Sequence, residues 1–191
     1  MKTSQAGKAF IAKNEGDCLT SKPDTTRNQI GHGHNLTSAE QETMSVYGID
    51  VSNGITLDQA DFILDLDVAK VDAAMNAQHL ALDLNQNQWD AVSDWVYNLG
   101  AGHLVDLLSH GVEDIPNQLP RWNRAGGNVL PGLVARRAAE VTLYNMADPC
   151  ECQRNRYCDY ADGHHTASSS AVDPLFSLPR IKSQLSIALW C

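Results

Sequence analysis

Apolar side chains recur every three or four residues along most of the chain, which is the spacing of α-helices with one buried face. The longest segment with this pattern is 56–79. Its apolar face consists of Ala60, Ile63, Leu64, Val68 and Val71. Asp67 lies on the same face, and a carboxylate at an otherwise apolar position needs a polar partner. The pattern therefore predicts one long helix that carries a paired acid.

Capping residues and helix breakers predict the other helices. The expected ranges are 4–15, 37–47, 84–99, 104–110, 115–124, 131–148 and 178–190. Ser4 and Thr56 are the expected N-caps of their helices, and Asp83 with Gln86 has the spacing of a capping box. Pro131 suits the first position of the last core helix, where its missing amide hydrogen does no harm. Residues 126–130 are expected to form a loop.

The segment 84–99 carries a stripe of large apolar side chains. The stripe consists of Trp89, Val92, Trp95, Val96 and Leu99. Tryptophan buries more surface than any other side chain, so we expect Trp89 to lie in the core. This segment is therefore predicted to be a central helix.

The stretch 14–35 interrupts the helical pattern. Its helix-breaking residues are Gly16, Pro23, Gly31 and Gly33. It therefore predicts a helix end followed by short extended pieces and a small hairpin. Glu15 closes the helix, and Asp24 follows nine positions later. Acid/base hydrolysis of a glycosidic bond requires a carboxyl on a rigid element facing a second carboxyl, although two acids alone are more often solvated surface groups.

Composition narrows the class of protein. The 191 residues are 43% hydrophobic, which suits one domain with a core of its own, alone or with an appendage. The net charge of −9 argues against nucleic-acid binding and against strong attraction to anionic walls or membranes. No apolar run reaches the roughly 18 residues of a membrane span, so no membrane insertion is expected. The first eight residues contain no apolar segment typical of a signal peptide.

The character of the chain changes at Pro149. We predict a catalytic domain over 1–148 and a cysteine-containing appendage over 149–191 that packs on it. The appendage contains Cys150, Cys152, Cys158 and Cys191, and also His164 and His165. The cysteine spacing differs from that of a zinc knuckle, which favours disulfides or free thiols over a metal. We expect neither a metal nor another cofactor.

Four separated blocks resemble the phage-type lysozymes, glycoside hydrolase family 24. They are Glu15–His34, Ile55–Val68, Leu84–Gly102 and Arg121–Glu140, and they occur in the family's order. The resemblance implies an α+β, mainly helical, two-lobed fold. A small lobe with a β-hairpin carries the catalytic loop 15–35, and the helix 56–79 connects it to a larger helical lobe. The implied activity is that of an endo-N-acetylmuramidase, which cleaves the β-1,4 bond between N-acetylmuramic acid and N-acetylglucosamine in peptidoglycan.

The resemblance also assigns catalytic roles. Glu15 matches the general acid, and Asp24 matches the second carboxylate, which positions water or stabilises positive charge on the sugar. The family's third member, a threonine, is replaced by Gln29, and the loop after Asp24 is one residue shorter. Either Gln29 orients the water, or Thr25 or Thr26 moves into place, or the stereochemical course differs. We favour Gln29 or Thr26.

The resemblance places further residues around the substrate. Those predicted to bind it are His34, Tyr97, Asn98 and Arg136. His34 should also pair with Asp67 and clamp the catalytic loop to the long helix. A place in the core is an equally open interpretation for Tyr97. One arginine of the pair 136–137 should approach Glu15 from the last core helix.

The sequence leaves two rival functions open. One is a peptidoglycan-binding relative that has lost catalysis, which only the shortened loop supports. The other is a glycosidase that acts on chitin. The expected setting is the bacterial periplasm or cell wall, reached from the cytoplasm through a holin or a secretion system. The chain would then be a monomeric phage endolysin or an antibacterial effector, and an effector would have an immunity protein as a further partner.

Overall fold

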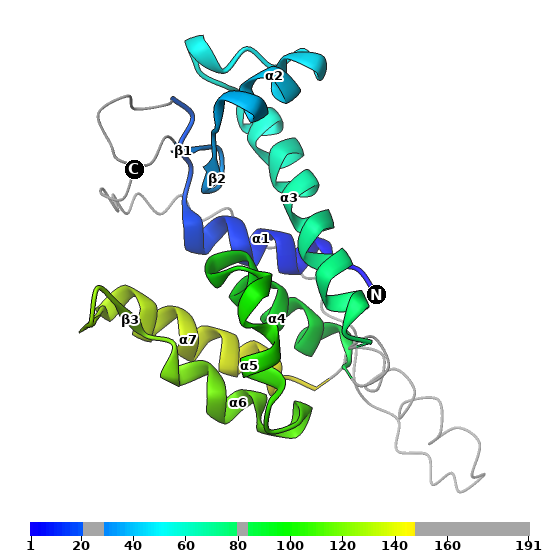
Figure 1. The fold of residues 1–191 in the computed structure, drawn as a ribbon, viewed down its shortest axis with the longest axis vertical. Helices are drawn as coiled ribbons and strands as arrows, with labels where there is room; N and C mark the ends of the chain where they lie inside the picture. The colour runs from blue at the N-terminus through cyan, green and yellow to red at the C-terminus, as the bar shows by residue number, and fades with distance from the viewer. Residues whose placement is uncertain (21–28, 80–83, 148–191) are drawn as a thin grey trace, which may run out of the picture. The chain divides into compact units, whose positions relative to one another are not determined.

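The computed structural model describes residues 1–20, 29–79 and 84–147, which belong to the compact unit Met1–Asp148. Figure 1 labels its helices α1 (Gln5–Glu15), α2 (Ser38–Val46), α3 (Leu57–Ala77), α4 (Gln86–Leu99), α5 (Leu104–Leu108), α6 (Ile115–Gln118) and α7 (Pro131–Tyr144). Strands β1 (Gln29–Ile30) and β2 (His34–Asn35) form one antiparallel hairpin. Strands β3 (Arg124–Ala125) and β4 (Asn128–Val129) form another. The predicted mainly helical α+β fold is confirmed.

Helix α3 is the long helix that the apolar pattern predicted. Its N-cap is Thr56, and Gln59 closes a capping box: the Gln59 amide donates to Thr56 Oγ1 at 3.2 Å, and the Thr56 amide donates to Gln59 Oε1 at 2.9 Å. The five predicted apolar positions are buried. Figure 1 shows α3 running from the end that carries α2 and the β1–β2 hairpin to the end that carries α4. It therefore connects the two lobes of the unit.

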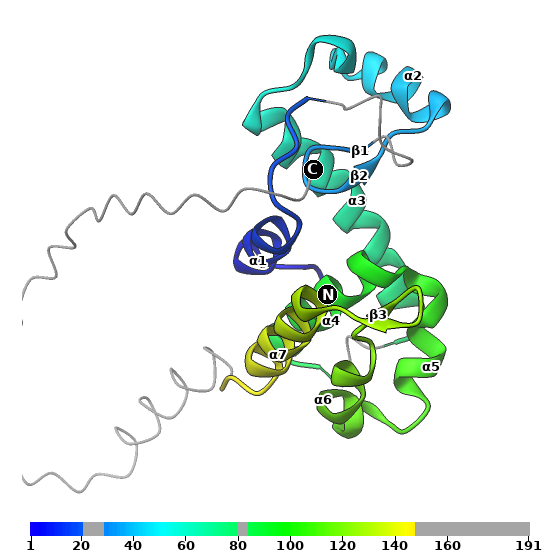
Figure 2. The same cartoon turned by 90° about the vertical axis from the view of Figure 1, so that its left-hand side faces the viewer.

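Each lobe has an apolar cluster of its own. The small lobe buries Ile30, Leu36, Met44, Ile49, Ile55, Ala60 and Ile63. The larger lobe is built around α4, whose Trp89 and Trp95 are fully buried, which confirms the core position of Trp89. Helix α4 packs against α1, α3 and α7. Figures 1 and 2 both show α1 between the β1–β2 hairpin and the pair α4–α7.

The start of α4 differs from the prediction. Its N-cap is Asn85, and the capping box closes with Gln88 instead of joining Asp83 to Gln86. The Gln88 amide donates to Asn85 Oδ1 at 3.0 Å, and the Asn85 amide donates to Gln88 Oε1 at 2.9 Å. Two overlapping residue pairs had suitable spacing, and the pair nearer the apolar stripe forms the cap.

The segment before α7 also differs from the prediction. The expected helix 115–124 ends at Gln118 and continues only as the 3-10 turn Leu119–Arg121. The expected loop 126–130 begins as the turn of the β3–β4 hairpin. Gly126 and Gly127 have φ values of 56° and 81°. A two-residue turn with both φ angles positive suits a hairpin and favours two glycines, so this Gly-Gly pair was the missed signal.

Several predicted helices end earlier than expected. Helix α3 ends at Ala77, α5 at Leu108 and α7 at Tyr144. The predicted helix 178–190 and the cysteines of the predicted appendage lie outside the described residues. None of the described helices has both the length and the apolar character needed to cross a membrane.

Candidate active site

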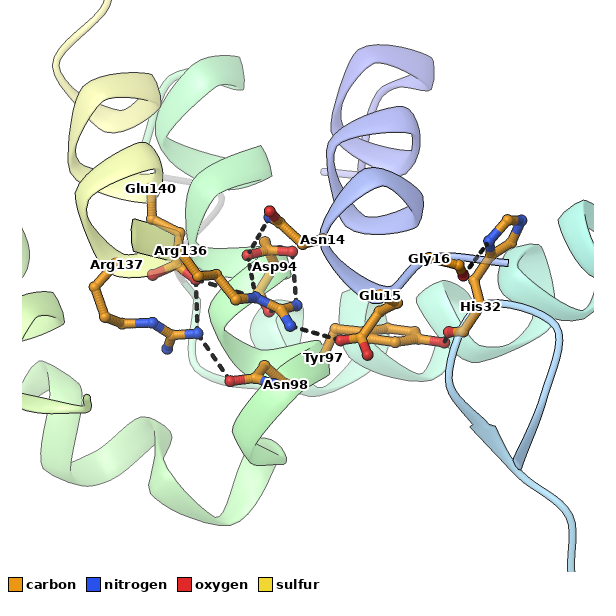
Figure 3. Close-up of polar contacts among 10 residues, drawn as sticks. All are labelled: Asn14, Glu15, Gly16, His32, Asp94, Tyr97, Asn98, Arg136, Arg137 and Glu140. Atoms are coloured by element: carbon orange, nitrogen blue, oxygen red, sulfur yellow. Dashed lines mark hydrogen bonds and ion pairs between the residues drawn. The ribbon is translucent and has the colours of Figure 1, made fainter. Parts of the chain in front are cut away.

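Glu15 is the last residue of α1, and the helix end fixes its position. Gly16 follows in the left-handed region with φ of 76°, and its amide donates to the Ala12 carbonyl oxygen at 2.8 Å. The Glu15 side chain is 18% exposed. Arg136 Nη1 donates to Glu15 Oε1 at 2.7 Å, which confirms the expected approach of an arginine from the last core helix. Figure 3 shows this contact between α1 and α7.

Arg136 is held in turn by Asp94 on α4. Arg136 Nε donates to Asp94 Oδ2 at 2.9 Å, and Nη2 donates to Oδ1 at 2.8 Å. Asn14 Nδ2 also donates to Asp94 Oδ2, at 3.2 Å. Burial lowers the pKa of Arg136, but the carboxylates of Asp94 and Glu15 outweigh burial, and the net pKa is raised above its ordinary value. Arg136 is therefore a fixed cation between two carboxyl groups.

A second buried pair on α7 extends this cluster. Arg137 Nη2 lies 3.0 Å from Glu140 Oε1 and donates to Asn98 Oδ1 at 2.8 Å. Burial, and then the neighbouring Asp94 carboxyl, raise the pKa of Glu140 to about 10. Burial also lowers the pKa of Arg137. Burial thus favours the uncharged form of Glu140, and Arg137 holds the side-chain oxygen of Asn98.

The turn of the β1–β2 hairpin lies against Glu15. Gly33 in this turn has φ of 80°, and a Cβ atom there would lie only 2.8 Å from Glu15 Oε2. Glycine is therefore needed for two reasons, the left-handed backbone and the close approach of the carboxyl. The turn therefore lies near Glu15 Oε2, whereas Arg136 donates to Oε1.

Tyr97 and His32 connect this turn to the helices. The Tyr97 hydroxyl donates to the His32 carbonyl oxygen at 2.6 Å. The His32 ring is buried, with Nδ1 3.2 Å from the Gly16 carbonyl oxygen and Nε2 2.9 Å from Asp61 Oδ1 on α3. Burial, and then the nearby carboxylates, raise the pKa of Tyr97, so its hydroxyl keeps its proton. His32 thus links the residue after Glu15 to the long helix.

The predicted pair of His34 and Asp67 forms at the edge of a cleft. His34 Nδ1 lies 2.6 Å from Asp67 Oδ2, and Lys70 Nζ donates to Asp67 Oδ1 at 2.8 Å. Burial raises the pKa of Asp67, but the hydrogen bonds from His34 and Lys70 outweigh it and hold the pKa below its usual range. The cleft has a volume of about 370 Å³, and its lining includes Gly33, His34, Asn35, Lys70, Val96 and Tyr97. Gly33, where an added Cβ atom would clash with Glu15, thus also lines the cleft.

The predicted site residues fall into four groups. Glu15 and Arg136 meet directly, and Asn98 reaches them only through Arg137. His34 and Tyr97 line the cleft. Gln29 pairs with Asn35 across the β1–β2 hairpin. Asp24, Thr25 and Thr26 lie outside the described residues.

Sequence reasoning missed Asp94, Glu140, His32 and the contact of Gly33 with Glu15. The signal for Asp94 was an acid directly before the core residue Trp95, which needs a cationic partner when it is buried. Across residues 1–20, 29–79 and 84–147, no group of three or more His, Cys, Asp or Glu side chains is arranged to hold a metal ion.

Comparisons with known proteins give this site a context. Residues 12–140 match the phage lysozyme family. The chain is 34% identical over 190 residues to the endolysin of Bacillus phage PZA, covering 93% of this chain and 64% of that protein. It is 30% identical over 158 residues to the endolysin of Acyrthosiphon pisum secondary endosymbiont phage 1, covering 77% of this chain and all of that protein. The chain thus spans a little under two thirds of the longer relative.

A solved structure agrees with these matches. The muramidase domain of SpmX from Asticaccaulis excentricus superposes with a TM-score of 0.59 at 27% identity, covering 76% of this chain and 99% of that domain. The resemblance of the four sequence blocks, the helical fold with its small hairpin and the family match over 12–140 agree with one another. This chain belongs to the phage lysozyme family.

Proposed function

We propose that this protein is a peptidoglycan hydrolase, an endo-N-acetylmuramidase with Glu15 as its general acid. The observation that carries the proposal is the placement of Glu15. Its carboxyl is mostly buried at a rigid helix end, held by Arg136, and in contact with a turn that lines a cleft. A positioned carboxylic acid beside a cleft is what protonation of a glycosidic oxygen requires.

The reaction follows from this role. Glu15 gives its proton to the glycosidic oxygen as the bond from that oxygen to the anomeric carbon breaks. The hydroxyl of a water molecule ends on the anomeric carbon, and the remaining proton goes to a carboxylate. We assign Asp24 as the second carboxylate, which stabilises the positive charge on the sugar or activates the water. Gln29 and Thr26 are our candidates for holding that water.

The contacts refine the roles proposed for the substrate-binding residues. Tyr97 and His34 border the cleft, and the Tyr97 hydroxyl is occupied by the His32 carbonyl oxygen. We therefore propose that the ring of Tyr97, and not its hydroxyl, meets the sugar. Both ends of the Arg136 guanidinium are bound to carboxyl groups. Arg136 accordingly acts on Glu15 and not on the glycan.

The test is digestion of purified peptidoglycan by the full chain. We expect release of fragments with N-acetylmuramic acid at the reducing end, identified by mass spectrometry after borohydride reduction. Glu15→Gln keeps the shape of the side chain but has no proton to donate, so activity should fall by at least about 100-fold. Glu42→Gln, at an exposed position on α2, should leave activity unchanged.

Three results would contradict the proposal in different ways. Equal activity of the native chain and Glu15→Gln would remove Glu15 from the mechanism. Binding to peptidoglycan without released fragments would support the rival function of a binding relative. Cleavage of chitin in preference to peptidoglycan would change the substrate class.

The biological setting is part of the same proposal. The relatives from phages are named endolysins, and we propose that this chain likewise acts on bacterial cell-wall peptidoglycan. We propose that it works as a monomer without nucleic acid, and that 149–191 is an appendage to the domain 1–148. Release through a holin fits an endolysin, while delivery by a secretion system and an immunity protein would fit an effector.

A further inference from the structure

The nearest charged partner of Glu15 is a cation. Arg136 Nη1 lies 2.7 Å from Glu15 Oε1. A cation within about 4–6 Å favours the ionised form of a carboxyl. A general acid must instead keep its proton until the substrate is bound. The positive charge of Arg136 must therefore be offset by another group.

Asp94 has the geometry to offset it. Its side chain has no exposed surface, and both of its oxygens accept hydrogen bonds from Arg136, at 2.9 and 2.8 Å. A two-point contact between a carboxylate and a guanidinium fixes orientation as well as charge. Because the pair is buried, the interaction is screened much less than it would be at the surface.

We propose that Asp94 is a positioning residue for Glu15. The buried carboxylate of Asp94 offsets the charge of Arg136 and fixes its orientation, so that the Glu15 carboxyl faces a weaker positive field than Arg136 alone would give. Arg136 then stabilises the Glu15 carboxylate after the proton has moved to the leaving group. This inference rests on the proposed muramidase function and adds a residue to it that the sequence resemblance did not supply.

The other titratable groups around Arg136 do not replace Asp94. Among the described residues they are Glu15 on α1, Tyr97 on α4, and Arg137 and Glu140 on α7. Glu140 Oε1 lies 3.8 Å from Arg136 Nε, but burial raises the pKa of Glu140, which favours its uncharged form. Arg137 is itself a cation. Asp94 is thus the group that supplies the offsetting negative charge.

The test compares two full-length variants, Asp94→Asn and Asp72→Asn. Asp72 is a matched control because it is also a buried, hydrogen-bonded acid: it accepts from Thr3 Oγ1 at 2.7 Å and from Trp89 Nε1 at 3.0 Å. Titration of the Glu15 carboxyl is followed by carbon-13 NMR on glutamate-labelled protein, with its signal assigned from Glu15→Gln. The pH dependence of kcat/KM on peptidoglycan is measured in parallel.

We expect Asp94→Asn to lower the titration midpoint of Glu15 by about one pH unit or more. The alkaline limb of the rate profile should move in the same direction, so the variant loses activity first at neutral and alkaline pH. Asp72→Asn should leave both the midpoint and the limb where they are, even if it loses stability. A merely structural role of Asp94 would give the two variants the same profile.

A third variant covers the case in which Asp94→Asn does not fold. Arg136→Gln removes the cation, so the Glu15 midpoint should rise. An unchanged Glu15 midpoint in folded Asp94→Asn would overturn the proposal, and so would an unchanged or lower one in Arg136→Gln. If the native chain released no fragments while the Glu15 midpoint shifted as expected, the proposed function would fail and the coupling of Asp94 to Glu15 would stand.

Discussion

Glu15 is held from two sides by contacts that differ in burial. On the side of α4 and α7, Arg136 and Asp94 form a network that is nearly closed to solvent. On the side of the small lobe, Gly33 leaves no room for a Cβ atom beside the carboxyl, and the hairpin that carries it is joined to α3 by the contact of His34 with Asp67. The contacts of Asp67 lie at the edge of an open cleft.

This difference separates two tasks. Buried charges interact strongly because little water screens them, so the helical side determines which charges face the Glu15 carboxyl. On the hairpin side, the contacts of Asp67 border the open cleft, and its partner Lys70 is largely exposed to solvent. Water screens these contacts, so their role is to place the turn beside Glu15. We therefore expect substitutions on the helical side to change stability and pH dependence, and substitutions in the hairpin to change activity more than stability.

Asp94→Ala should have the largest effect on stability. It leaves the guanidinium of Arg136 buried without its two-point partner, and breaking a buried pair in this way costs about 3–5 kcal/mol. The measurement is urea denaturation followed by circular dichroism. Glu42→Ala, at an exposed position on α2, is the control and should change the free energy of unfolding by less than about 0.5 kcal/mol. If Asp94→Ala lowered the free energy of unfolding by less than about 1 kcal/mol, the helical side of Glu15 would not be the more strongly bound of its two sides.

Glu140→Gln should change how stability depends on pH. The pKa of Glu140 is raised in the folded state, to about 10, so its stabilising proton is fully present below the unfolded pKa and is lost as pH rises through the folded value. Between these limits the native chain should lose stability relative to Glu140→Gln, which cannot ionise, at up to about 1.4 kcal/mol per pH unit. Parallel stability curves for the two proteins between pH 5 and pH 9 would show instead that Glu140 is ionised in the fold.

Gly33→Ala should separate activity from stability on the hairpin side. Both Gly33 and Gly48 have left-handed backbones, with φ of 80° and 73°, but a Cβ atom at Gly48 would meet no atom within 4 Å. Each alanine should cost about 1–2 kcal/mol of stability through backbone strain. Only Gly33→Ala should also displace the Glu15 carboxyl, and a displacement of about 1 Å can lower kcat/KM by about 100-fold.

The test compares the activity lost by Gly33→Ala with the activity lost by Gly48→Ala. Activity is measured as release of soluble fragments from peptidoglycan at a temperature where both variants are folded. If Gly48→Ala lost as much activity as Gly33→Ala, backbone strain alone would explain the loss. The contact between Gly33 and Glu15 would then have no separate role.

The sequence predicted the parts of the fold that depend on neighbouring residues. The caps at Ser4 and Thr56 and the apolar face of α3 are local patterns, and they appear where expected. The resemblance supplied Glu15 and the pair of His34 with Asp67. The Gly-Gly turn of the second hairpin was also a local signal, but the helical pattern on either side of it obscured it.

The network behind Glu15 could not be predicted in the same way. Every α4 residue from Trp89 to Val96 is buried, so helical periodicity does not distinguish Asp94 from its neighbours. Its partner Arg136 is 42 positions away on another helix, and only the packing of α4 on α7 brings the two together. The same holds for the contact of Gly33 with Glu15: the glycine predicts a turn, but not what the turn touches.

Lys70→Ala should have the smallest effect on stability, and it tests the solvent-exposed contacts on the hairpin side of Glu15. The Lys70 side chain is 67% exposed and adds one ion pair to Asp67, and such pairs contribute about 0.2–1 kcal/mol. The pKa of Asp67 is lowered in the fold, so its contribution is present above the unfolded pKa and is lost as pH falls through the folded value. The stability difference between the native chain and Lys70→Ala should therefore shrink in acid and in high salt, because protonation or screening removes the same attraction. A difference that persisted in 1 M salt would mean that the hairpin side is as closed to water as the network around Asp94.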